Sequence, residues 1–248
     1  MAGHSKWANI KIRKGAQDAK RGKIFTKLIR EIVTAARIGG PEPSFNPRLR
    51  AALLAARAQN MPKDTMDKAV KRGAGAEDGT DYKEVRFEGY GPGGVAVIVD
   101  TLTDNNNRTV ADVRHGFNKY GGNMGASGCV AYLFDKKGEL LFQDVDEEKL
   151  MEAALEAGAE DMISADGECA VITAPEEFET VREALAKAGF ANPLSAEVTL
   201  RPQNTVTLND EKQASSMLKL LDMLEDNDDV QKVHANFDIP DEIMERLG

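Results

Sequence analysis

The spacing of apolar residues predicts a helical start to the chain. Apolar positions first recur at the three- and four-residue spacing of one helix face, which favours an amphipathic helix. Asn46 is then a good N-cap, and Pro47 suits the first helical position because its missing N–H would have no partner there anyway. The predicted helices are 22–37, 47–59 and 62–73. Together they form a small bundle over 22–75, and a small, polar linker follows it.

Beyond residue 81 the apolar period changes to two, which is the spacing of half-buried strands. Residues 136–202 then follow the order βαββαβ, the split-βαβ plan of ferredoxin-like domains. The segments on either side each supply half of a second such unit. Its predicted elements are strand 95–99, helix 107–119, strand 128–134, strand 205–208, helix 210–224 and strand 230–237.

We therefore predict an α+β fold. An N-terminal three-helix domain is followed by two ferredoxin-like (βαββαβ) domains, the second inserted into the first. The predicted parts are a basic arm at 1–21, a helical bundle at 22–75, a ferredoxin-like domain from 82–135 plus 203–238, an inserted ferredoxin-like domain at 136–202, and a short terminal helix at 239–248.

Charge is segregated along the chain. The whole sequence carries a formal net charge of −9, but residues 1–75 contain 17 Lys and Arg against 5 Asp and Glu, a net charge of +12. The remainder contains 15 basic and 36 acidic residues, a net charge of −21. A basic head on an acidic body is expected when one module binds a polyanion and the rest must not bind it non-specifically.

The basic arm is the candidate site. A flexible cationic arm with one aromatic residue can become ordered on RNA or DNA, with cations on phosphates and the aromatic ring available for stacking. A solubilising, disordered tail is the alternative. The predicted nucleic-acid-binding residues are Lys6, Trp7, Lys11, Arg13, Lys14, Lys20, Arg21, Lys23 and Lys27.

A second basic stretch follows the polar loop 104–107, where Arg108 and Arg114 lie on or near one helix. They are candidates for a secondary nucleic-acid contact. The alternative is a helix cap formed by the asparagines, followed by an exposed helix face.

Other motifs indicate no chemistry. The glycine-rich turn 89–94 has the spacing of a dinucleotide fingerprint, but a strand follows it and Pro92 removes an N–H, so a hairpin turn is favoured. The acidic cluster 225–229 lacks the alternating pattern of a calcium loop, so a solvated helix end is favoured. We predict no catalytic residues, no metal site and no cofactor.

The sequence shows no long apolar segment and no cysteine motif, and this bears on where the protein is expected to act. Its longest apolar runs are about five residues, far below the roughly 20 needed to span a bilayer. No apolar segment of a signal peptide follows the first basic residues, although a mitochondrial presequence is a closer alternative. Cys129 and Cys169 show no metal or redox spacing and are expected to be buried thiols. We expect a cytoplasmic monomer that does not enter a membrane.

Several segments also carry a family resemblance. They include AGHSKWANIKIRKGAQDAKRGKIFTKLIREI, NPRLRAALLAARAQNMPKDT, FEGYGPGGVAVIV, TDNNNRTVADVRHGFNKYGG and LEDNDDVQKVHANFD. In this order the chain resembles the YebC/PmpR family over essentially its full length. The resemblance implies an N-terminal helical domain followed by two α/β domains. Ile12 departs from the family pattern, which usually has His at that position, while the surrounding cations are intact.

The resemblance leaves two functions open. Bacterial members are described as probable transcriptional regulators that bind DNA, which fits the basic head. Mitochondrial members are described as translational activators, including that of cytochrome c oxidase. The family is also placed on the ribosome, assisting synthesis of difficult sequences such as proline runs. The alternative is therefore a ribosome-associated translation factor that binds ribosomal or transfer RNA.

Overall fold

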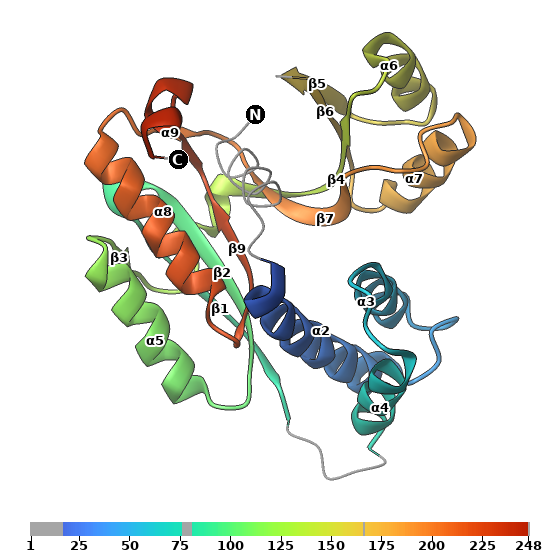
Figure 1. Ribbon diagram of the computed structural model, residues 1–248, viewed down its shortest axis with the longest axis horizontal. Coiled ribbons are helices and arrows are strands. Elements are labelled where there is room, and N and C mark those ends of the chain that lie inside the picture. Colours follow the sequence, from blue (N-terminus) through green and yellow to red (C-terminus); the bar gives the residue numbers. More distant parts are fainter. Residues whose placement is uncertain (1–16, 76–80, 166, 248) are drawn as a thin grey trace. The chain divides into compact units, whose positions relative to one another are not determined.

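The computed structural model describes residues 17–75, 81–165 and 167–247, and this part of the chain opens with helices. They are α2 (Gln17–Gly39), α3 (Pro47–Ala58) and α4 (Lys63–Gly73) (Figure 1). The predicted helices are confirmed, but α2 begins before the predicted start at Gly22. The reason is that residues 17–21 contain good helix formers without an apolar stripe, which begins only at Ile24.

An apolar core holds the bundle together. Ile32, Leu49 and Ala56 are fully buried in it, and Met66 of α4 packs in the same cluster. Asn46 fixes the turn between α2 and α3. Its side-chain oxygen accepts from the backbone N–H of Leu49 at 3.0 Å, and its amide nitrogen donates to the carbonyls of Ala35 at 2.7 Å and Gly40 at 2.8 Å. The predicted N-cap is thus also a cross-link between the two helices.

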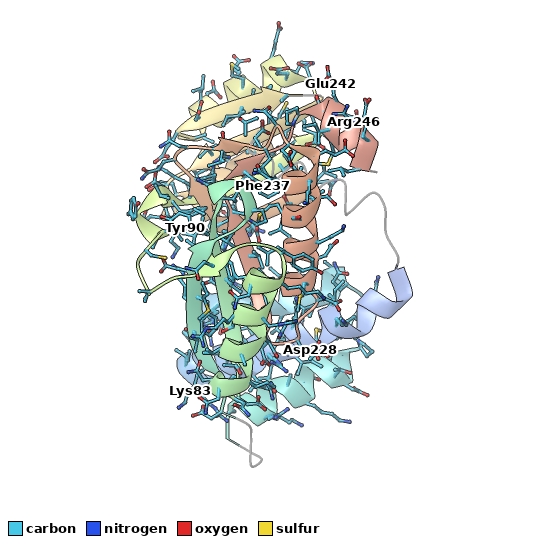
Figure 2. All side chains as sticks on the ribbon, turned by 90° about the vertical axis from the view of Figure 1, so that its left-hand side faces the viewer. Lys83, Tyr90, Asp228, Phe237, Glu242 and Arg246 are labelled. Atoms are coloured by element: carbon cyan, nitrogen blue, oxygen red, sulfur yellow. The ribbon has the colours of Figure 1, made fainter. Side chains whose placement is uncertain are left out.

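An antiparallel sheet follows the bundle. Its strands are β1 (Lys83–Tyr90), β2 (Ala96–Thr103), β3 (Asn123–Met124) and β9 (Val230–Ala235), in the order β3-β1-β2-β9. The predicted hairpin turn joins β1 to β2, where Gly93 has the positive φ of 73° that favours glycine. Helices α5 (Asn106–Lys119) and α8 (Glu211–Glu225) lie side by side on this sheet (Figure 1), and Lys83 and Tyr90 mark the two ends of β1 (Figure 2).

The segment predicted as an inserted domain forms a second antiparallel sheet. Its elements are β4 (Phe134–Gln143), α6 (Glu147–Glu156), β5 (Asp161–Ala165), β6 (Glu168–Thr173), α7 (Phe178–Lys187) and β7 (Ser195–Pro202). The strand order β5-β6-β4-β7 places the first strand between the third and the fourth. The βαββαβ prediction for this segment is confirmed, and its helices pack on the sheet through Leu150, Val181 and Leu185.

The predicted strand 128–134 is wrong. Residues 125–130 form a loop, Ala131–Leu133 form a short 3-10 helix, and Phe134 already belongs to β4. The physical reason is Glu88, whose buried carboxylate accepts from the backbone N–H groups of Gly128 at 2.8 Å and Val130 at 2.9 Å. These donors bind a side chain instead of a neighbouring strand. The short β3 takes the predicted place in the sheet.

The predicted strand 205–208 is also misplaced. Only Val206–Thr207 is a strand, β8, and it pairs in parallel with β10 (Phe237–Asp238) instead of joining the larger sheet. The place next to β2 is taken by β1, which pairs with it over its whole length. In the first α/β sheet, β1 occupies the position that the third strand has in a ferredoxin-like domain. The ferredoxin-like strand order is therefore kept. The short helix α9 (Asp241–Leu247) then ends the described chain, as predicted.

The described residues divide into two compact units. One contains Ala131–Thr207 and Asn236–Asp238. The other contains the bundle, the first α/β sheet, helix α8 and helix α9. The finer domain boundaries given above stay a prediction. Within the described ranges, every helix is too short or too polar to cross a membrane.

Candidate nucleic-acid interface

Most of the predicted arm lies outside the described residues. This holds for Lys6, Trp7, Lys11, Arg13 and Lys14. Lys20 and Arg21 belong to the first turns of α2, but the structure does not describe their side chains. The described part of the candidate site therefore begins with Lys23.

Three cations on one face of α2 contact the end of α8 or the loop that follows it. Lys23, Lys27 and Arg30 follow the i, i+4, i+7 spacing of a single helix face. The Lys27 Nζ donates to the carbonyl of Glu225 at 2.6 Å, and the Lys23 Nζ donates to the carbonyl of Asp226 at 3.2 Å. Lys23 also forms an ion pair with the Asp226 carboxylate at 2.6 Å. Because the last carbonyls of a helix carry partial negative charge, they attract cations.

Arg30 binds deeper, at Asp229. The guanidinium of Arg30 donates to the Asp229 carboxylate and, at 3.0 Å, to the carbonyl of Leu102. Asp229 is only 2% exposed. It also accepts from Arg108 Nη2 at 2.8 Å and from the Thr109 hydroxyl at 2.7 Å. One buried carboxylate therefore joins α2, α5 and the loop after α8.

Two opposing effects set the acidity of Asp229. Burial alone would raise its pKa, because it disfavours the charged carboxylate. Hydrogen bonds from Arg30, Arg108 and Thr109 outweigh burial and hold the pKa of Asp229 below its usual value. The carboxylate is thus ionised, and it binds donors of the same chain. The expectation of a solvated helix end at 225–229 is wrong for Asp229.

The polar loop after β2 explains how Arg108 reaches this carboxylate. Asn105 caps α5 by accepting from the Arg108 backbone N–H at 3.1 Å, so an asparagine forms the cap, but two residues before Asn107, where the sequence places it. The cap directs Arg108 and Thr109, in the first turn, towards Asp229. Arg108 also pairs with Asp104 at 2.8 Å, and the hydrogen bonds to both carboxylates raise its pKa. Its charge is therefore already neutralised within the chain.

Arg114 has different surroundings. It lies on α5 with an exposed side chain and, within the described ranges, forms no hydrogen bond or ion pair. Of the two residues predicted for a secondary contact, Arg114 is thus the one whose charge is available.

Two of the arginines of α3, Arg48 and Arg50, are bound to neighbouring groups. Arg48 Nε and Nη2 donate to the two oxygens of Glu31 at 2.6 and 3.0 Å, and Arg48 also pairs with Glu84 of β1. Arg50 Nη1 donates to the carbonyl of Pro43 at 2.9 Å. These bonds stabilise the bundle and its connection to β1. They also occupy two of the guanidinium groups that α3 carries.

Other cations of the bundle remain exposed. In the described part of the chain they form no hydrogen bond or ion pair, and none of them is among the nucleic-acid-binding residues predicted from the sequence. They are Arg57 on α3 and Lys63, Lys68 and Lys71 on α4. Their signal in the sequence is weak, because Asp64 and Asp67 lie between them. Because these acids balance the nearby basic charge, the sequence gives little sign that the four cations lack partners among the described residues.

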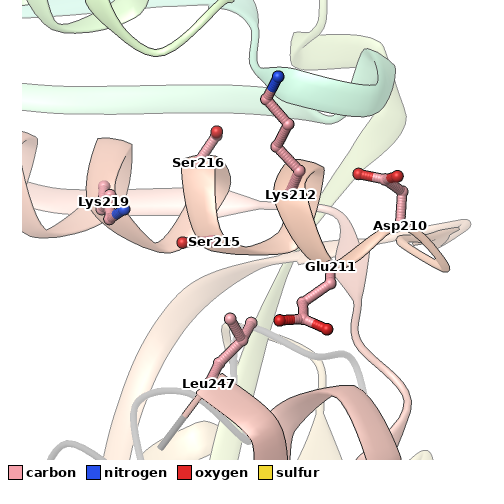
Figure 3. A pocket seen from close by; sticks show the side chains of 7 residues that line it. All are labelled: Asp210, Glu211, Lys212, Ser215, Ser216, Lys219 and Leu247. Atoms are coloured by element: carbon pink, nitrogen blue, oxygen red, sulfur yellow. The ribbon is translucent and has the colours of Figure 1, made fainter.

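A shallow pocket of about 590 Å³ lies between α8 and α9 (Figure 3). Lys212, Ser215, Ser216 and Lys219 of α8 line it, together with Leu247 and two acidic residues at the start of α8. Glu211 points towards Leu247, whereas Lys212 points away from it (Figure 3). Within the described ranges, neither Ser215 nor Ser216 forms a side-chain hydrogen bond to a base in this lining. Among the described residues, no group of His, Cys, Asp and Glu could hold a metal ion.

Comparison with known proteins gives the family. A family model described as the TACO1/YebC protein N-terminal domain matches residues 5–76, and one described as the TACO1/YebC second and third domain matches residues 82–237. The chain belongs to the TACO1/YebC family. The resemblance found in the sequence is thereby confirmed.

Several known proteins are similar to this chain over all or nearly all of their length. A probable transcriptional regulatory protein of Magnetococcus marinus is 67% identical, with 100% of each chain covered. A probable transcriptional regulatory protein of Geobacter sulfurreducens is 58% identical, again with 100% of each chain covered. A solved structure of a conserved hypothetical protein from Aquifex aeolicus is 50% identical, with a TM-score of 0.82 over 92% of this chain and 97% of that chain.

Proposed function

We propose that this TACO1/YebC family member is a cytoplasmic, nucleic-acid-binding regulator of gene expression. Its basic arm and helical bundle bind the phosphate backbone, and it needs no cofactor and catalyses no reaction. The observation that carries the proposal is the segregation of charge, +12 over residues 1–75 against −21 over the rest. The exposed cations of α3 and α4 support it, because they have no partner among the described residues. The relatives' names support a regulator.

DNA is the first candidate target, in keeping with the relatives' names as transcriptional regulators. A ribosome-associated factor that binds ribosomal or transfer RNA is the second candidate, and one observation favours it. Arg48 and Arg50 of α3 are both engaged within the protein, so this helix offers few groups for reading base edges in a major groove. Binding through phosphates and a stacking aromatic residue suits folded RNA as well as DNA.

The test is a salt titration of binding to a labelled DNA duplex and to a labelled RNA hairpin. If about five cations reach phosphates, the log–log slope of affinity against salt is about −3.5 to −4.5. Removing residues 1–16 deletes four basic residues without cutting into α2, so we expect a smaller slope and weaker binding. An unchanged slope after this deletion would contradict a role for the arm. Cosedimentation with ribosomes, beside a DNA competitor, separates the two candidate targets.

A further inference from the structure

The end of α8 occupies two of the cations that the proposed function assigns to nucleic acid. We call Glu225 and Asp226 the acidic latch. It offers Lys27 a carbonyl at 2.6 Å, and it offers Lys23 both a carbonyl and a carboxylate. These anionic or partly negative oxygens are the kind of acceptor that a phosphate group supplies. The latch and a phosphate therefore compete for the same two ammonium groups.

The contacts along α2 differ strongly in their exposure to water. In the Lys23–Asp226 pair the side chains are 41% and 64% exposed, whereas in the Arg30–Asp229 pair they are 12% and 3% exposed. An exposed ion pair is weak and is screened by salt, but a buried, hydrogen-bonded pair resists exchange. The outer contacts can therefore open while Arg30 keeps α2 attached to the loop after α8.

We propose that the acidic latch is an intramolecular competitor, which holds Lys23 and Lys27 until nucleic-acid phosphates displace it. This inference rests on the proposed function, since it concerns the same cations. A single phosphate that replaces the latch gains little binding free energy, because its contacts with Lys23 and Lys27 only replace those that the latch already makes. A polyanion gains more, because contacts with the arm and with the exposed bundle cations accompany the exchange. The latch thus favours densely charged nucleic acid over small anions.

Asp226→Asn tests the latch, and Asp228→Asn is its matched control. Asp228 lies in the same turn between α8 and β9 (Figure 2). Its carboxylate is exposed and forms no hydrogen bond or ion pair within the described ranges. Both substitutions remove one negative charge from nearly the same place, but only Asp226→Asn weakens the hold on Lys23. The probes are the labelled DNA duplex and RNA hairpin, titrated with each full-length variant at rising salt.

The expected result is that Asp226→Asn binds at least one probe about two- to fivefold more tightly than Asp228→Asn at low salt. Its salt slope stays close to that of Asp228→Asn, because Lys23 reaches a phosphate in the complex of either variant and the number of neutralised phosphates is the same. Equal affinities for the two variants, or weaker binding by Asp226→Asn, would overturn the latch and leave the proposed function intact. If the wild-type protein binds neither probe, the proposed function fails and the latch fails with it.

Discussion

Asp229 connects the parts of the chain that carry opposite charge. Arg30 of α2 and Arg108 of α5 both donate to its carboxylate, and Thr109 adds a hydroxyl donor. Removing one partner from a buried, hydrogen-bonded charge pair leaves the other charge uncompensated, which is strongly destabilising. The residue is therefore expected to matter for folding and not for direct contact with nucleic acid.

Asp229→Asn should lower the free energy of unfolding at neutral pH by about 3 kcal/mol. The pKa of Asp229 is held below the ordinary value of about 3.9, so its stabilising contribution is complete above that value. This contribution is lost as pH falls through the lowered pKa. Denaturant unfolding at neutral and acidic pH should therefore show a difference between wild type and variant that shrinks in acid. Asp228→Asn is the control, and a loss of stability as small as the control's would contradict this role.

At the scale of elements, the sequence pattern correctly predicted those helices and strands that depend on residues close together in the chain. The helices of the bundle follow from the stripe around Ile32 and from the Asn46 cap, and the βαββαβ order of the inserted segment follows from alternation and turns. Strand pairing is non-local, so the sequence did not reveal that β1 takes the place predicted for 205–208. Nor did it reveal that the N–H groups of Gly128 and Val130 would bind the Glu88 carboxylate.

The same limit applies to the candidate site. The spacing of Lys23 and Lys27 predicts an attraction to anions, but not that one such anion is Asp226 of the same chain. The cap at Asn105 was predictable from its neighbours in sequence, whereas the contact of Arg108 with Asp229 joins residues far apart in the chain. Charge and periodicity locate the candidate surface, and only the fold shows which of its cations are already occupied.

The start of α2 gives a prediction at the scale of an element. Gly22 lies inside this helix and is exposed, and an added Cβ would meet no atom within 4 Å beyond its chain neighbours and the backbone of its own helix turn. Gly22→Ala should therefore raise the free energy of unfolding by about 1 kcal/mol, because alanine favours a helix interior over glycine by about that amount. If the helix instead began at Gly22, the glycine would act as an acceptable N-cap and alanine would destabilise the protein. Denaturant unfolding distinguishes these outcomes by sign.

At the scale of the whole molecule, the chain combines a basic N-terminal region with an acidic remainder. The ion pairs of Arg48 with Glu84 and of Lys23 with Asp226 join the bundle to the first α/β sheet and its helix α8. Because these pairs are partly exposed, salt weakens them together with any binding to a polyanion. A net negative charge opposes non-specific binding to nucleic acid. We therefore propose that nucleic acid binds to the exposed cations of the bundle.

The most direct test of that claim compares two variants with equal changes in charge. One replaces Arg57, Lys63, Lys68 and Lys71 of the bundle with glutamine. The other replaces Lys136, Lys187, Lys212 and Lys219 with glutamine; these lysines are also exposed and lie outside the bundle. Both are titrated with the labelled DNA duplex and RNA hairpin at rising salt. We predict that only the bundle variant shows a smaller salt slope, by about one for each cation that contacts a phosphate. Equal losses in the two variants would contradict a nucleic-acid surface on the bundle.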